Sequence, residues 1–119
     1  MNDELSYIFK LQIKKQNIFF GPGVIQLLSL IGEHKSILKA SKQMKLAYTK
    51  ALKMINTAEQ NFGFSLLLRT TGGLSGGGSH LTQKARLVIE SYIQFEKEVL
   101  LTCDTSFIEF AKSLDRLQK

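Results

Sequence analysis

The pattern of hydrophobic and polar positions at the start of the chain predicts a short strand pair followed by a buried helix. Residues 9–14 alternate apolar and polar side chains, which is typical of a half-buried strand, and residues 18–20 could return beside it. Gly21-Pro22-Gly23 then forms a turn in which Pro22 suits the first position of a helix. A broad apolar face from Pro22 to about His34 predicts a first helix that is mostly buried.

Two further helices are predicted on either side of a short break. Ser36 is a suitable N-cap for a short helix that runs to about Met44. Residues 45–47 break the pattern, and a longer amphipathic helix is expected from about Tyr48 to Phe62. Gly63 follows as a left-handed residue that ends this helix. A short and a longer helix joined by such a turn form a helix-turn-helix.

The rest of the chain predicts a glycine-rich hairpin and C-terminal helices. Residues 64–69 are strand-like, residues 72–78 contain five of the nine glycines, and residues 80–82 can return the strand. A hairpin in this position makes the helix-turn-helix winged. Thr82 can cap a long helix, residues 103–105 have weak helix propensity, and Ser106 and Glu109 have capping-box spacing, so we expect a second helix from about Ser106 to Leu117. The predicted fold is mainly α (α+β): one domain over residues 1–119, with a core at 8–100 and a helical extension at 101–119.

Composition excludes several classes of site. The chain has 119 residues, 44% of them hydrophobic and 22% charged, as expected for one globular domain. Its single cysteine, Cys103, excludes an intramolecular disulfide and a cysteine-based zinc site, and we interpret it as inert packing. The two histidines are far apart in the sequence, so no metal site is expected.

No catalytic constellation or membrane segment is evident in the sequence. Residues 72–79 approach the spacing of a phosphate-binding loop, but they lack its lysine and lie between predicted strands. We therefore expect no enzymatic activity and no cofactor. The acidic N-terminus does not resemble a signal peptide, and the longest uncharged run, residues 16–32, is too short to span a bilayer. The expected location is the cytoplasm, without membrane attachment.

The charge is distributed unevenly. The net charge is +6, and the window from residue 35 to residue 53 holds six lysines and no acid, whereas residues 89–119 hold six acids and four bases. A basic face beside the helix-turn-helix indicates a polyanion partner, and double-stranded DNA suits the small and cationic side chains of the second helix. The alternative is a solvated lysine face. The residues predicted to contact DNA are Tyr48, Thr49, Lys50 and Lys53 in the major groove, and Ser36, Lys39, Arg69, Thr71, Ser75 and His80 at the backbone.

Four stretches give the sequence a resemblance to a known family. Residues 19–63, 66–73 and 75–82 and the helix that follows resemble the N-terminal DNA-binding domain of ModE-type molybdate-dependent transcriptional regulators, a LysR-like winged helix-turn-helix. The resemblance implies a bacterial transcription factor that binds a palindromic operator as a homodimer through its terminal helices. It also implies that Tyr48, Thr49 and Lys50 begin the recognition helix.

The sequence departs from the family pattern at three points. The chain ends about 20 residues after the winged domain, where longer members carry an oxyanion-binding module, so we expect it to bind no molybdate. Leu74 replaces a basic residue of the wing, which should weaken phosphate contact there. Ala47 replaces the serine before the recognition-helix tyrosine, which removes one expected cap or phosphate contact.

The C-terminal helices carry more apolar positions than a small domain can cover. A monomer would expose much of this stripe, so we expect a two-fold dimer. The positions are Val99, Leu100, Leu101, Phe107, Ile108, Phe110, Ala111, Leu114 and Leu117. The alternative function is a protein-interaction module on a winged-helix scaffold that does not bind DNA sequence-specifically. RNA binding is a weaker alternative, because Tyr48 is the only aromatic residue on the predicted outer face.

Overall fold

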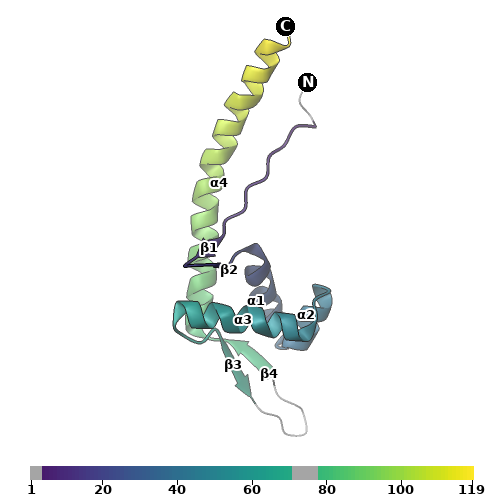
Figure 1. The fold of residues 1–119 in the computed structure, drawn as a ribbon, viewed down its shortest axis with the longest axis vertical. Coiled ribbons are helices and arrows are strands. Elements are labelled where there is room, and N and C mark those ends of the chain that lie inside the picture. The colour runs from purple at the N-terminus through teal and green to yellow at the C-terminus, as the bar shows by residue number, and fades with distance from the viewer. Residues whose placement is uncertain (1–3, 71–77) are drawn as a thin grey trace.

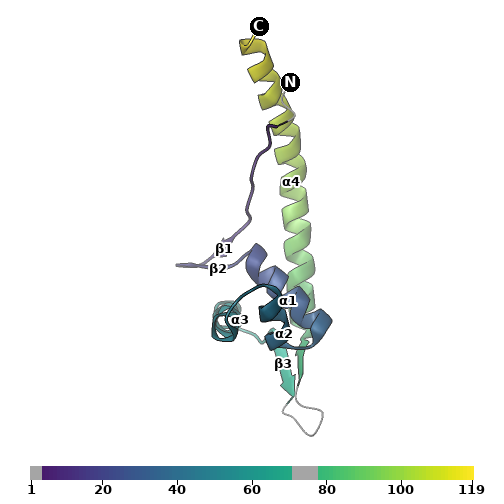
Figure 2. The same ribbon diagram turned by 90° about the vertical axis from the view of Figure 1, so that its right-hand side faces the viewer.

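Helix α1 (Pro22–His34) lies at the centre of the fold and contacts helix α2 (Ile37–Gln43), helix α3 (Tyr48–Phe62) and strand β4 (Gly78–Leu81) (Figure 1). The computed structural model describes residues 4–70 and 78–119. Strands β1 (Ile13–Lys14) and β2 (Ile18–Phe20) form one antiparallel pair, and β3 (Leu67–Thr70) and β4 form another. Helix α4 (Gln83–Leu117) projects far beyond the remaining elements (Figures 1 and 2). The predicted winged helix-turn-helix with a long C-terminal helix is confirmed.

The core forms where the apolar faces of these helices meet. Leu27, Leu28 and Ile31 of α1 and Ile55 of α3 are fully buried, as is Leu66 just before β3. Burial of each large aliphatic side chain contributes about 1.5–3 kcal/mol. Small side chains complete the packing, namely Ala40, Ala51, Ala58 and Ala85.

The ends of the helices follow the capping residues predicted from the sequence. The hydroxyl of Ser36 accepts a 3.1 Å hydrogen bond from the backbone amide of Lys39 at the start of α2. Thr82 accepts a 3.0 Å hydrogen bond from the amide of Ala85 at the start of α4. Gly63 ends α3 with a φ of 84°, in the left-handed region that favours glycine. These local signals therefore mark the start of α2, the end of α3 and the start of α4.

The predicted strand over residues 9–14 is shorter than expected. Only Ile13 and Lys14 pair with β2, because β2 itself has three residues and the register shifts between Ile13 and Lys14. The preceding residues run as an extended segment beside α4 (Figures 1 and 2). There the hydroxyl of Tyr7 donates to the Asp104 carboxylate, and the Tyr7 ring packs 5.1 Å from that of Phe107.

The predicted division of the C-terminal region into two helices is wrong. Helix α4 continues without interruption for 35 residues. Asp104 is held by Tyr7, and the hydroxyl of Thr105 donates a 3.1 Å hydrogen bond to the carbonyl of Leu101 one turn earlier. Helix propensity is a weak preference that tertiary context overrides, so the low propensity of residues 103–105 does not interrupt α4, and Ser106 lies inside the helix without capping it.

Candidate nucleic-acid interface

The exposed face of α3 carries the side chains predicted to enter the major groove. Ala51, Ile55 and Ala58 are buried on the face that packs against the core. Thr49, Lys50 and Lys53 are exposed on the opposite side. Tyr48 begins the helix with 44% of its surface exposed. The 15-residue amphipathic helix thus holds its cationic and hydroxyl groups on a solvent-facing surface.

A second set of predicted residues meets around a hollow of about 240 Å³. Ser36 comes from the start of α2, Tyr48 from the start of α3, and Arg69 from β3. Three elements distant in sequence therefore bring a hydroxyl, a phenol and a guanidinium to one site. Lys39 is exposed one turn into α2.

The base of the wing is held firmly to the end of α1. The hydroxyl of Thr70 accepts a 2.9 Å hydrogen bond from the amide of Gly78 and donates one of 3.2 Å to its carbonyl. The amide of Ser79 donates a 3.1 Å hydrogen bond to the carbonyl of Lys35. The wing strands therefore leave the body in a direction set by backbone contacts.

The wing register separates two of the predicted contact residues. Arg69 pairs with Ser79, whereas His80 pairs with Leu68. Because side chains alternate between the faces of a strand, Arg69 and His80 lie on opposite faces of the two-stranded ribbon. The structure places Arg69 with Ser36 and Tyr48 but does not place His80 there. Thr71 and Ser75, like Leu74, lie outside the described residues.

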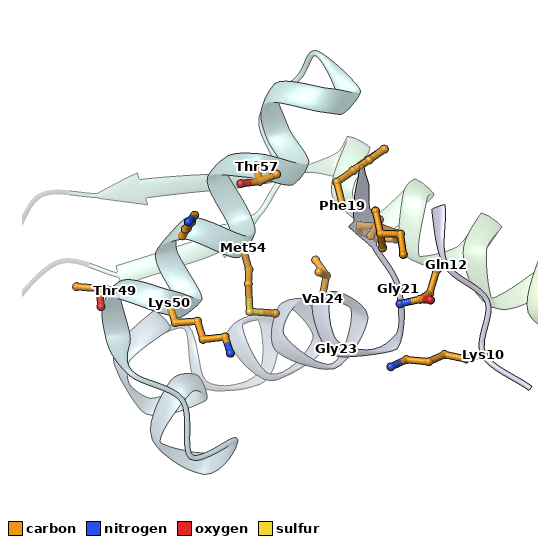
Figure 3. Close-up of a pocket in the computed structure, with 13 residues that line it drawn as sticks. Lys10, Gln12, Phe19, Gly21, Gly23, Val24, Thr49, Lys50, Met54 and Thr57 are labelled. Carbon is orange, nitrogen blue, oxygen red and sulfur yellow. The ribbon is translucent and has the colours of Figure 1, made fainter. Parts of the chain in front are cut away.

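A larger groove of about 730 Å³ runs between the β1–β2 hairpin and α3 (Figure 3). Thr49, Lys50 and Lys53 line it from α3, and Lys10 lines it from the segment that leads into β1. Phe19, Phe20, Val24 and Met54 are among its apolar lining residues. Lys10 was missed by the sequence analysis, which interpreted its segment only as a strand.

The charge pattern contained a signal for Lys10. From residue 5 to residue 58 the sequence has nine lysines and one acid, Glu33, so the acid-poor region begins well before the helix-turn-helix. All nine lysines are exposed. Within residues 4–70 and 78–119 none of them has an ion-pair partner. Their charges are available to a polyanion.

The described residues give less support to a metal site, a cysteine-based site or a membrane-spanning helix. No group of histidine, cysteine, aspartate or glutamate within the described part of the chain could hold a metal ion. Cys103 is a half-buried free thiol on α4. Among the described residues, no helix combines the length and apolar character that crossing a membrane requires.

Comparison with known proteins confirms the resemblance noted in the sequence. No protein-family model matches the chain. The transcriptional regulator ModE of Haemophilus influenzae is 33% identical over 96 residues, which cover 81% of this chain and 36% of that protein. The molybdenum transport protein ModE of Azotobacter vinelandii is 33% identical over 95 residues, covering 80% of this chain and 31% of that protein.

The DNA-binding transcriptional dual regulator ModE of Escherichia coli K12 is 35% identical over 92 residues, covering 77% of this chain and 34% of that protein. The chain thus spans about a third of the length of the curated relatives it matches. These relatives are named as regulators or as a transport protein. The expectation that this chain binds no molybdate stays a prediction.

Proposed function

We propose that the chain is a ModE-like, DNA-binding transcriptional regulator and that it binds a palindromic operator as a homodimer. The observation that carries this proposal is the exposed face of α3, where Thr49, Lys50 and Lys53 line a groove that has no acid among its lining residues. Curated relatives named as transcriptional regulators support the same conclusion.

In this proposal α3 enters the major groove. Lysine at a helix surface can donate to the O6 and N7 atoms of guanine or to phosphate, and threonine can contact several bases. We assign Lys50 and Thr49 to base edges, Lys53 to the next turn, and Tyr48 to the edge of the groove. Lysines of α2 add attraction that does not depend on sequence.

The hollow formed by Ser36, Tyr48 and Arg69 is proposed to hold a phosphate of the DNA backbone. The Arg69 guanidinium can donate two parallel hydrogen bonds to phosphate oxygens, and the Ser36 hydroxyl can donate a third. Lys39 would contact the same strand. Thr71, Ser75 and His80 are retained as proposed wing contacts, and His80 would contact DNA from the opposite face of the ribbon.

Helix α4 is proposed to form the dimer interface. It carries large hydrophobic side chains that are about half exposed or more: Leu87, Ile93, Phe95, Leu101, Ile108, Phe110 and Leu117. Leu101 and Ile108 are seven residues apart, as are Phe110 and Leu117, which is the repeat that pairs helices. A two-fold dimer would present two copies of α3 to the half-sites of a palindrome.

A protein-interaction module is the second candidate, and the exposed hydrophobic side chains of α4 favour it as much as they favour a dimer. The α3 face distinguishes the two, because an interaction module has no requirement for a lysine-rich surface without acids.

DNA binding can be tested by fluorescence anisotropy across a salt series. The probes are a labelled fragment of the chain's own upstream region and a scrambled fragment of equal length. We expect tighter binding to the first, with log affinity falling by about 0.9 per phosphate contact for each unit of log salt. Equal, weak binding to both fragments would contradict operator recognition, and no binding at low salt would favour the interaction module.

A further inference from the structure

The β1–β2 hairpin carries a cluster of unpaired cations. Lys14 and Lys15 are exposed at its turn, and Lys10 is exposed in the segment that leads into it. The turn is closed by a 3.3 Å hydrogen bond from the amide of Lys15 to the carbonyl of Asn17. None of the three lysines has an ion-pair partner within the described ranges.

The hairpin is held in a fixed position on the body. The ring of Phe19 packs edge-on against Phe62 of α3 at 5.1 Å, and Phe20 packs edge-on against Phe62 at 5.0 Å and against Tyr92 of α4 at 5.6 Å. At the base of the hairpin, the hydroxyl of Tyr92 donates to the carbonyl of Leu11. Because two helices hold it, the hairpin presents its lysines at a defined place and is not a loose arm.

Helix α3 lies between this hairpin and the wing strands. In Figure 2 α3 is seen nearly end-on, with β1 and β2 on one side of it and β3 on the other, and Figure 1 shows the same order along the long axis of the molecule. Across the groove, Lys10 and Lys50 extend toward the same opening (Figure 3). The groove is lined by three lysines and by no acid.

A helix in the major groove of DNA, which is about 12 Å wide, is flanked by one phosphate strand on each side. A wing on one side of α3 meets one of these strands, so an element on the other side meets the second. From this arrangement we infer that the β1–β2 hairpin is a second backbone-binding arm. The sugar-phosphate strand passes over the groove between Lys10 and Lys50, and Lys14 and Lys15 contact neighbouring phosphates. This inference rests on the proposed DNA binding through α3.

Charge complementarity selects the occupant of the groove. The apolar floor suits the deoxyribose rings, and the three ammonium groups suit phosphates. Backbone contacts of this kind contribute affinity and salt dependence without sequence information.

The experiment compares the full chain with the double variant Lys14→Ala and Lys15→Ala on operator and scrambled DNA across a salt series. The matched control replaces Lys97 and Lys119, two exposed lysines of the C-terminal region, and removes the same charge far from α3. We expect the salt slope of the hairpin variant to become shallower by about one unit per lysine, with the ratio of affinities for the two DNAs unchanged. The control should retain the slope of the unmodified chain.

Other outcomes overturn the inference in distinguishable ways. Equal salt slopes for the hairpin variant and the unmodified chain would show that the hairpin lysines do not contact DNA. An equally shallow salt slope in the control variant would show that the effect comes from net charge alone. A changed affinity ratio would mean that the hairpin contacts bases. Absence of DNA binding by the unmodified chain would instead refute the proposed function. Phosphate ethylation interference gives a positional check, since the hairpin variant should lose interference only at phosphates on the hairpin side of α3.

Discussion

The hydroxyl of Tyr92 in α4 donates a 2.7 Å hydrogen bond to the backbone carbonyl of Leu11, 81 residues earlier in the chain. The bond joins the long helix to the base of the β1–β2 hairpin, and the Tyr92 ring also packs against Phe20 of β2. Ala85 and Tyr92 are the buried residues of α4, and Tyr92 is the only large side chain of the two. The position of the hairpin beside α3 therefore depends on α4.

Replacing Tyr92 with phenylalanine keeps the ring contact and removes this hydrogen bond. We expect Tyr92→Phe to lower the free energy of unfolding by about 0.5–1.5 kcal/mol, because the Leu11 carbonyl loses its donor. Chemical denaturation at neutral pH measures the change. Tyr48→Phe is the matched control, since Tyr48 is 44% exposed and makes no hydrogen bond within the described residues. An equal loss in both variants would contradict the assigned role of the bond.

Alkaline pH should weaken both tyrosine hydrogen bonds that join α4 to the N-terminal segment, those of Tyr7 and Tyr92. The hydrogen bond to Asp104 raises the pKa of Tyr7 to about 12, and burial raises the pKa of Tyr92 above its usual value. An unfolded tyrosine ionises near pH 10, so between about pH 10 and 12 the unfolded chain has lost protons that the folded chain keeps.

The free energy of unfolding should therefore fall as pH rises through this interval, while the tyrosine contribution is fully present below it. The measurement is the difference between the unmodified chain and the double variant Tyr7→Phe and Tyr92→Phe across the interval. The variant should show the flatter profile, and parallel profiles would show that other groups cause the decline.

The end of α3 offers a test of backbone conformation alone. Gly63 has a φ of 84°, and a Cβ built on it would meet nothing within 4 Å. Gly63→Ala should therefore cost about 1 kcal/mol of stability through the left-handed conformation and not through a clash. Gly23→Ala is the control, because its Cβ would lie 3.9 Å from the Met54 methyl group in ordinary contact at a helical position. We expect Gly23→Ala to be neutral or slightly stabilising in thermal denaturation, and a loss equal to that of Gly63→Ala would be evidence against this explanation.

Helix boundaries could be predicted because their causes are local. Ser36, Gly63 and Thr82 act through hydrogen bonds or backbone angles within a few residues, and the observed bounds of α3 match the sequence prediction. The expected strand over residues 9–14 depended on a partner, and β2 offers only three residues. The contact of Tyr7 with Asp104 joins α4 to a distant part of the chain, and sequence spacing does not reveal it.

In the candidate site too, the residues set by local pattern could be predicted, and those brought together by tertiary packing could not. The outward face of α3 followed from helical periodicity, so Lys50 and Lys53 could be identified in advance. Ser36 and Arg69 line the same hollow because the wing packs against α1 and α2, and this packing could not be predicted from the sequence pattern. Lys10 lines the same groove as Lys50 because the aromatic contacts of Phe19 and Phe20 place the hairpin beside α3.

The proposed dimer predicts that a charge on the exposed stripe of α4 will separate the protomers. Phe110 is 55% exposed, and Phe110→Glu would place a carboxylate where a second α4 should pack. Loss of an aromatic contact in an interface, together with burial of a carboxylate, costs about 2 kcal/mol or more, so the dimer dissociation constant should rise by more than about tenfold. Sedimentation velocity measures the assembly state.

Thr102→Glu is the matched control for this experiment, because it adds the same charge at an exposed polar position of the same helix. It should leave the dimer intact if the apolar stripe forms the interface. A monomeric unmodified chain would refute the dimer, and an unaffected Phe110→Glu dimer would place the interface elsewhere.

Lys50→Ala tests whether α3 contacts bases. If the Lys50 ammonium donates to a guanine, its removal should weaken operator binding by about 1–3 kcal/mol and reduce discrimination against scrambled DNA. If Lys50 contacts phosphate alone, affinity should fall equally on both DNAs and the salt slope should become shallower by about one unit. Lys112→Ala provides the control, since Lys112 lies on α4 and pairs with Glu109 at 3.5 Å. Unchanged affinity in the Lys50 variant would show that Lys50 does not contribute to DNA binding. Because Lys50 also lines the groove beside Lys10, a loss on both DNAs would strengthen the case for a backbone strand in that groove.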